Sequence, residues 1–377
     1  VAMMSRMGGA RVKTFSIGSE EERYNELPYA RLVAERFETE HHEFIVKPDA
    51  IEVLPRLIWH FNEPFADSSA LPSFYLAQMT RSHVTVALNG DAGDENFGGY
   101  ERYVAAKLAG WLDILPRGVR ARLLRPLIGL LPGGGEEKSA TRRLRRFLEA
   151  LLLSRERRYA RWASIMDDEF KSSLYSEALA SRLAQRDAFS HILKCYEEVQ
   201  EEAPDFIDAT ILVDINSYLP DDLLVKMDIM TMAHSLEARS PFLDHPFMEF
   251  AARIPSSLKV RGKTTKYLLR KALGELLPRE VLERGKMGFG VPIGRWFRRE
   301  LKDWVREILL DGQSLGRDYF RRKALEGIIS EHAGGLRDNG FLLWNLLNLE
   351  LWHRQFIDSA PRAARAALAT PEVREGS

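Results

Sequence analysis

The segment from Asn89 to Tyr100 holds the residue types best suited to chemistry. It reads Asn-Gly-Asp-Ala-Gly-Asp-Glu-Asn-Phe-Gly-Gly-Tyr, so that Asp91, Asp94 and Glu95 lie close together. These carboxylates repel one another unless a metal ion or a cationic side chain neutralises them. Because only oxygen ligands are at hand, with no Cys or His nearby, the residue types point to Mg²⁺ rather than zinc. An acidic turn between a strand and a helix would carry the same residues, and this segment alone does not decide between the two.

Two later segments carry further charged residues. Asp221, Asp222, Lys226 and Asp228 are spaced so that one helix would bring them near one another. The apolar residues between them predict a buried helix, and buried charges need partners. A surface pair of Lys226 with Asp222 is the simpler alternative. Lys286 precedes a glycine-rich turn, from which its ammonium can reach a phosphate.

The elements that must position these residues are expected to form an α/β arrangement. Apolar, β-branched runs predict strands at residues 12–17, 42–46 and 84–88, and the segments between them predict helices at residues 25–36, 51–61 and 70–81. This order indicates a parallel sheet with right-handed crossovers. Ligands bind at the carboxyl ends of parallel strands. The acidic segment, directly after the third strand, should therefore lie at the ligand-binding edge.

Composition excludes several classes of partner. The 377 residues contain 54 Lys and Arg against 54 Asp and Glu, so nothing argues for nucleic acid or an acidic membrane as the main partner. The arginines between Arg120 and Arg146 alternate with leucines and are interpreted as the solvated faces of amphipathic helices, in preference to a nucleic-acid patch. No apolar run approaches the ~20 residues that span a bilayer, and the first residues do not resemble a signal peptide.

The single cysteine, Cys195, excludes an internal disulfide and indicates a cytoplasmic setting. It follows His191 by four residues in an expected helix, where we favour helix packing over a catalytic dyad. Breaks near Pro116 and Pro132 suggest the domain division. We expect a nucleotide-binding α/β portion at residues 1–110, a helical portion at 111–358 that completes the site, and a disordered tail at 359–377.

Taken together and in order, five segments resemble the C-terminal synthetase domain of the glutamine-hydrolysing asparagine synthetases. The resemblance covers roughly residues 1–356 and rests on the segments Thr14–Gly18, Asn89–Tyr100, Leu219–Asp222, Ser235–Asp244 and Lys286–Phe289. It implies the pyrophosphatase-loop ATP-binding class, a doubly wound parallel sheet of the adenine nucleotide alpha-hydrolase kind with a largely helical extension. It also implies adenylation of the aspartate side chain by ATP with Mg²⁺, followed by amide formation with ammonia.

The resemblance assigns roles to individual residues. Asp94 would bind the Mg²⁺ on pyrophosphate, and Lys286 would contact the phosphates and the developing adenylate. Ile17 would offer its backbone to adenine. Asp91, where the family often has Glu, would lie near the reacting acyl group and, with Lys286, count as catalytic. The remaining implied roles are nucleotide binding by Asn89 and Gly90, support of the substrate or metal surroundings by Asp228, and structural support of the site by a buried charge network at Arg239–Asp244.

The chain departs from the family pattern in two places. The phosphate loop Ser-Gly-Gly-x-Asp-Ser is absent, and Val1 is not the cysteine nucleophile of a glutaminase domain. We therefore expect an amino-terminally truncated synthetase portion, whose ammonia would come from the missing glutaminase domain in the full-length enzyme. A homodimer is compatible with the resemblance. Two alternatives stay open: a related adenylating ligase of the β-lactam or peptide cyclase type, and a catalytically silent nucleotide-binding module.

Overall fold

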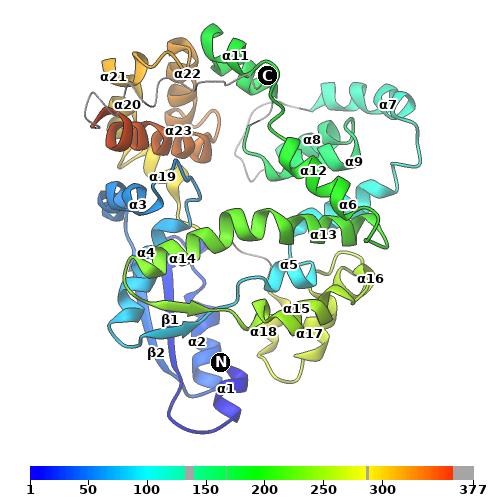
Figure 1. Cartoon of the computed structure of the whole chain (residues 1–377), viewed down its shortest axis with the longest axis vertical. Helices are drawn as coiled ribbons and strands as arrows, with labels where there is room; N and C mark the ends of the chain where they lie inside the picture. The colour runs from blue at the N-terminus through cyan, green and yellow to red at the C-terminus, as the bar shows by residue number, and fades with distance from the viewer. Residues whose placement is uncertain (132–139, 167, 286–287, 360–377) are drawn as a thin grey trace, which may run out of the picture.

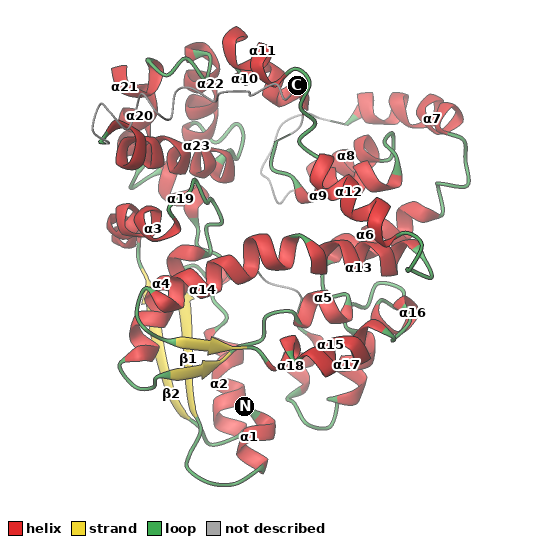
Figure 2. Ribbon diagram, viewed as in Figure 1, coloured by secondary structure: helices red, strands yellow, loops and turns green. Residues whose placement is uncertain are grey.

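The computed structural model describes residues 1–131, 140–166, 168–285 and 288–359. Helices dominate this part of the chain, and its strands form two short parallel pairs (Figures 1 and 2). Parallel strands within a mostly helical chain agree with the expected α/β class in its coarse form. None of the described helices is both long enough and apolar enough to span a membrane.

The first pair of strands is β1 (Lys13–Ser19) with β2 (Glu40–Val46), in the register Lys13↔Glu40 to Ser19↔Val46. The second pair is β3 (Val86–Leu88) with β4 (Glu237–Arg239). The three predicted strands are therefore confirmed, with ends that shift by about two residues. Strand β4 was not predicted, because its sequence Glu-Ala-Arg lacks the apolar run that marks a buried strand.

The helices around β1 and β2 are α1 (Ala2–Arg6), α2 (Leu27–Arg36), α3 (Leu54–Phe61) and α4 (Ala70–Arg81). The predicted helix at 70–81 is confirmed at both ends, and the predicted helix at 51–61 is a 3₁₀ turn followed by α3. Side chains alternate along a strand. His41 of β2 faces the cavity next to α2, whereas Phe44 stacks on Tyr75 of α4 with ring centroids 5.9 Å apart. The two helices thus cover opposite faces of the β1–β2 pair.

Most of the helices that follow β3 form the upper and right-hand parts of the molecule in Figure 1, whereas α14 lies beside α4. Their bounds are α5 (Gly93–Phe97), α6 (Glu101–Gly110), α7 (Arg117–Leu130), α8 (Ala140–Ala150), α9 (Arg155–Ala163), α10 (Asp168–Leu174), α11 (Glu177–Leu183), α12 (Ser190–Val199), α13 (Phe206–Asn216), α14 (Val225–Met232), α15 (His245–Ala252), α16 (Ser256–Lys259), α17 (Tyr267–Ala272), α18 (Arg279–Glu283), α19 (Ile293–Arg298), α20 (Lys302–Leu310), α21 (Gly312–Leu315), α22 (Arg322–Ala333) and α23 (Gly340–Trp352). A π-helix, Leu219–Leu224, precedes α14 directly.

The largest hydrophobic core joins the first and last parts of the chain. It contains Ile17 of β1, the buried faces of α3 and α4, and apolar residues of α19, α20, α22 and α23 such as Trp344. A second core forms around Tyr103, Tyr159 and Tyr196, from α6, α9 and α12. Burial of this much apolar surface is the main stabilising term in such a fold, and it fixes the carboxyl-terminal helices against the strands.

The burial of Arg120 and Cys195 bears on two of the expectations from the sequence. Arg120 is buried and pairs with Asp113, so this member of the arginine run is not on a solvated face, whereas Arg122 is exposed as expected. Cys195 is buried, and burial raises the pKa of its thiol, which leaves it protonated at neutral pH. A protonated, buried thiol agrees with helix packing. The expected tail lies outside the described residues from position 360 onward.

Candidate active site

The acidic segment is held in place by β4 and the turn that follows β4. The Asn89 amide donates to the Arg239 carbonyl at 2.9 Å, which continues the β3–β4 ladder. The Ser240 hydroxyl donates to the Asp91 carbonyl at 2.6 Å, and the Asn96 side-chain amide donates to a backbone carbonyl of the same turn at 2.7 Å. The segment that carries the chemistry therefore depends on residues about 150 positions later in the chain.

The stretch 239–244 was expected to support the site through a buried charge network, and that expectation is wrong in its physical basis. Arg239 pairs with Glu237 at 2.6 Å, but both side chains are more than half exposed. The support comes instead from neutral hydrogen bonds of Ser240 and from the Phe242 ring, which contacts Phe97 and the Cα side of Gly93. An exposed ion pair contributes little stability, whereas buried hydrogen bonds and packing fix a loop firmly.

Asp91 and Asp94 are directed to different partners. The Asn89 side-chain amide donates to Asp91 at 2.7 Å, and burial raises the pKa of the Asp91 carboxyl despite the nearby Lys226 charge. Asp94 lies 3.0 Å from the ammonium of Lys266. Lys266 has a backbone φ of 50°, in the left-handed region that non-glycine residues seldom adopt. Such strain is found where a side chain must be aimed at a site.

The third carboxylate, Glu95, faces the protein interior. Its side chain accepts a short hydrogen bond from the Tyr100 hydroxyl, and burial raises the pKa of the Glu95 carboxyl. The Arg102 guanidinium lies 4.1 Å from the centre of the Tyr100 ring. Glu95 is therefore occupied by structural partners. The three carboxylates that the sequence groups together thus separate into three environments.

A buried lysine connects the acidic segment to the start of α4. Lys226 of α14 donates to Asp67 at 2.6 Å, and Asp67 also accepts from the Ser69 backbone amide at 2.8 Å. Burial and the like charge of Asp67 raise the pKa of Asp222 to about 6. The predicted need of the buried helix for charge partners is thus met, but Lys226 bonds to Asp67 rather than to Asp222.

Asp228 lies elsewhere on α14. Residues two apart on a helix point in nearly opposite directions, and Asp228 is exposed whereas Lys226 is buried. The structure therefore does not bring the Asp228 side chain to the Asp67–Lys226 pair.

A narrow cavity lies at the carboxyl end of β1 and β2. It is lined by Ile17 and Gly18 of β1, Val46 of β2, Pro72 of α4 and the segment 288–291. Ile17 is buried and belongs to the largest hydrophobic core. Lys286 lies outside the described residues, whereas Gly288 and Phe289, two and three positions later in the sequence, line this cavity.

The first turn of α4 lies between the two parts of the site. Pro72 borders the Ile17 cavity, and Asp67, just before the helix, binds the lysine that influences Asp91. The backbone N–H groups at the start of α4 already have partners, because Ala70, Leu71 and Ser73 donate to the carbonyls of Asp67, Ser68 and Ser69 and Pro72 has no N–H. The site therefore offers carboxylate oxygens and ammonium groups at the carboxyl ends of parallel strands, where ligands bind in open α/β sheets.

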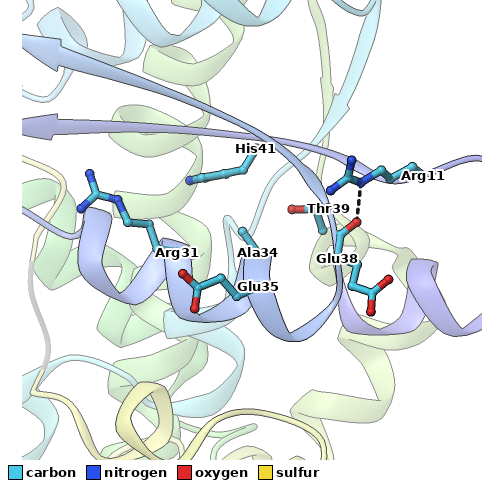
Figure 3. Close-up of a pocket in the computed structure, with 7 residues that line it drawn as sticks. All are labelled: Arg11, Arg31, Ala34, Glu35, Glu38, Thr39 and His41. Carbon is cyan, nitrogen blue, oxygen red and sulfur yellow. Dashed lines mark hydrogen bonds between the residues drawn. The ribbon is translucent and has the colours of Figure 1, made fainter.

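A wider cavity of about 560 Å³ lies near the amino ends of β1 and β2. Arg11, Arg31 and His41 line it together with Glu35 and Glu38 (Figure 3). Its guanidinium groups already have partners, because Arg11 donates to the Glu38 carbonyl and Arg31 forms two hydrogen bonds with Glu43. Balanced charge of this kind leaves little attraction for a phosphate, so we do not place the nucleotide here.

Sequence reasoning missed three contributors to the site: Asp67, Ser240 and Lys266. Asp67 lies just before the helix predicted at residues 70–81, where its sequence position does not indicate a bond to Lys226, and the hydroxyl of Ser240 carries no signal of its partner. Lys266 lies in a stretch, residues 259–271, that contains five other lysines and arginines, so its type alone does not distinguish it. Only the folded arrangement singles it out, through Asp94.

Comparison with known proteins gives a consistent result. The family model described as asparagine synthase matches residues 1–354. Asparagine synthetase [glutamine-hydrolyzing] 1 of Bacillus subtilis is 34% identical over 343 residues, which are 91% of this chain and 52% of that protein. The putative asparagine synthetase [glutamine-hydrolyzing] of Mycobacterium tuberculosis is 32% identical over 368 residues, 95% of this chain and 53% of that protein. The chain spans about half the length of these curated relatives.

Proposed function

Because this chain belongs to the asparagine synthase family, we propose that it provides the synthetase function of a glutamine-hydrolysing asparagine synthetase. In this function the side-chain carboxylate of aspartate attacks the α-phosphorus of ATP, and pyrophosphate leaves. Ammonia then attacks the acyl carbon, so that AMP departs and asparagine is formed. The ammonia would come from glutamine through a glutaminase domain.

One observation carries the proposal. Two lysine–carboxylate pairs accompany the acidic segment, which the hydrogen bond from Ser240 to Asp91 anchors: Lys266 pairs with Asp94 of the segment, and Lys226, paired with Asp67, acts on Asp91 through its charge. Bringing an anionic substrate to an anionic nucleotide requires fixed positive charge. Lys226 and Lys266 supply such charge in the described part of the chain, and Lys286 is proposed to add to it at the phosphates.

The carboxylates fit the requirements of Mg²⁺. This ion is commonly bound by one or two carboxylates together with substrate phosphates, and Asp94 is a partly accessible carboxylate beside a cation. Asp94 is proposed to hold the Mg²⁺ of the nucleotide, where the ion would neutralise phosphate charge. Asp91, with its raised pKa, is proposed to lie near the reacting acyl group and to help orient ammonia.

The remaining parts of the proposal follow from the same family. Ile17, Asn89 and Gly90 are proposed to bind the nucleotide, and Asp228 to support the substrate or metal surroundings. The two parallel strand pairs are proposed to belong to one doubly wound sheet of the adenine nucleotide alpha-hydrolase kind. The division at residues 110 and 358, a cytoplasmic location and a homodimer complete the proposal.

The proposal is tested by measuring the release of pyrophosphate from ATP by the full encoded protein. With Mg²⁺, aspartate and ammonium present, we expect pyrophosphate, AMP and asparagine in equal amounts. With aspartate whose side-chain oxygens carry a heavy isotope, one labelled oxygen should appear in AMP. Formation of ADP and phosphate would contradict adenylation. Pyrophosphate release that ignores aspartate would indicate a different acid, and nucleotide binding without turnover would indicate a silent module.

A further inference from the structure

A second cluster of metal-ligating side chains lies away from the proposed active site. Glu40 and His42 are two residues apart on β2 and therefore project from the same face of the strand. His83, between α4 and β3, lies over that face. One ligand atom from each residue lies within 4.8 Å of the other two. Among the described residues, Glu40, His42 and His83 thus form a group of three side chains that could hold one metal ion.

The rings of this cluster are held by stacking. His42 and His83 have ring centroids 4.0 Å apart at an interplanar angle of 33°. Phe15 of β1, which pairs with His42 in the strand register, stacks on His42 at 5.2 Å and contacts His83 at 5.5 Å. The His42 ring, restricted by its neighbours on both sides, would lose little conformational entropy on binding a ligand.

The distances are close to those of a tetrahedral ion. The Glu40 carboxylate lies 3.0 Å from Nε2 of His42. Two ligands of a tetrahedral zinc ion, at about 2.1 Å each, lie about 3.4 Å apart. The first two ligands therefore need only a small adjustment, and the exposed His83 can supply the remaining approach by a side-chain rotation. Its exposure also gives the ion a path of entry.

The donor set distinguishes this cluster from the acidic segment. Two imidazole nitrogens and one carboxylate suit Zn²⁺ and its neighbours in the transition series, whereas Mg²⁺ prefers oxygen ligands alone. The main competitor for Glu40 is Lys13, whose ammonium lies 3.6 Å away with its side chain 39% exposed. Such an exposed pair is weak and does not prevent metal binding.

We propose that Glu40, His42 and His83 form a structural Zn²⁺ site with water as the fourth ligand. The cluster lies at the amino ends of the strands, whereas the Ile17 cavity and the acidic segment lie at their carboxyl ends. The ion would fasten the end of α4 to β2. Because α4 begins beside Asp67 and Pro72, the site would hold in place the helix whose first turn borders the proposed active site.

The chain contains a matched control on the other face of β2. His41 and Glu43 are also two residues apart, with Nε2 and the carboxylate 3.2 Å apart. Glu43, however, accepts two hydrogen bonds from Arg31, at 2.8 and 2.7 Å. Among the described residues, no third metal-ligating side chain lies close enough to His41 and Glu43 to complete a site. His41→Gln should therefore leave zinc binding unchanged, whereas His83→Gln should weaken it.

The experiment is calorimetric titration of the nucleotide-free protein with zinc chloride, with excess Mg²⁺ present to fill oxygen-only sites. We expect one equivalent of zinc to bind, and His83→Gln to weaken binding by about tenfold or more. Because His83 is exposed, this variant should fold, and circular dichroism checks that it does. Zinc should also raise the melting temperature of the wild type and of His41→Gln, but not of His83→Gln.

Three outcomes would overturn the proposal. The first is the absence of a saturable zinc site, and the second is equal affinity in the wild type and His83→Gln. The third is an equal loss in His41→Gln and His83→Gln, which would indicate non-specific binding to surface imidazoles. A tetrahedral absorption spectrum with Co²⁺ in place of zinc, lost in His42→Gln, would support the assigned ligands.

Discussion

The ammonium of Lys266 lies 3.0 Å from the carboxylate of Asp94. The pair joins the acidic segment to the start of α17, and Gly99 lies directly against both side chains. Asp94 is thus neutralised by the protein itself. A cation that binds to Asp94 must share it with Lys266, which suits an ion that arrives already coordinated to phosphates.

Replacing Asp94 tests the proposed metal ligand. Asp94→Asn keeps the shape of the side chain but removes its charge, so we expect the Mg²⁺-dependent rate of pyrophosphate release to fall by about 100-fold, as for a loss of about 3 kcal/mol. Glu101→Gln, a change at the exposed first residue of α6, directly after the acidic segment, is the control and should leave the rate unchanged. An unaltered Mg²⁺ dependence in Asp94→Asn would contradict the assignment.

Gly99 can be tested by adding one methyl group. A Cβ at this position would overlap the Asp94 carboxylate and approach Cε of Lys266 to 2.5 Å. Gly99→Ala should therefore separate the pair and lower the free energy of unfolding by about 1–3 kcal/mol. Gly118→Ala meets no atom within 4 Å and serves as the control. Urea denaturation of both variants measures the effect, and equal stability would show that the pair tolerates displacement.

Lys226 is expected to matter for stability because it is buried. Its side chain is 7% exposed and Asp67 is 21% exposed. Lys226→Met would leave the Asp67 carboxylate without its counter-charge, at a cost of about 2–4 kcal/mol. Lys194→Gln removes a lysine from an exposed pair with Glu198 and should cost less than about 0.5 kcal/mol. A similar loss in both variants would mean that burial does not strengthen the Asp67 pair.

Asp222 predicts a dependence of stability on pH. Its pKa of about 6 lies above the usual value of 3.8, so between these values the folded state binds more protons than the unfolded state. The protonated Asp222 carboxyl therefore contributes to the free energy of unfolding fully below about pH 4, and this contribution is lost as the pH rises through about 6. Asp222→Asn should remove this decrease in the free energy of unfolding with rising pH, which amounts to about 1–3 kcal/mol.

The measurement is denaturant unfolding of the wild type and Asp222→Asn across that pH range. Asp221→Asn is the control, because Asp221 is exposed and pairs with His191 on the surface. A parallel decline in the wild type and Asp222→Asn would assign the titration to another group.

Local patterns predicted the elements that are encoded locally. The helix at 70–81 and the strands β1 and β2 could each be predicted from the pattern of their own residues. The family relation was also predictable, because five separate segments in a fixed order carry it, and it is confirmed.

Features that depend on distant partners were not predictable in the same way. Strand β4 exists because its backbone pairs with β3, and its exposed Glu237 and Arg239 give no apolar signal. The divergence of Asp91, Asp94 and Glu95 depends on Asn89, Lys266 and Tyr100, of which Lys266 is far away in the sequence. Spacing along the chain predicts which charges are near one another, but the fold decides which of them pair.

The pairing of β3 with β4 has a consequence for the order of assembly. Val86 pairs with Glu237, and the hydrogen bond from Ser240 to Asp91 follows that pairing by a few residues. Contacts between residues about 150 positions apart form late, because a long loop must close before they are gained. During synthesis, the acidic segment leaves the ribosome well before the turn that anchors it. A nascent chain therefore acquires the geometry of this candidate site only after β4 and Ser240 have been made.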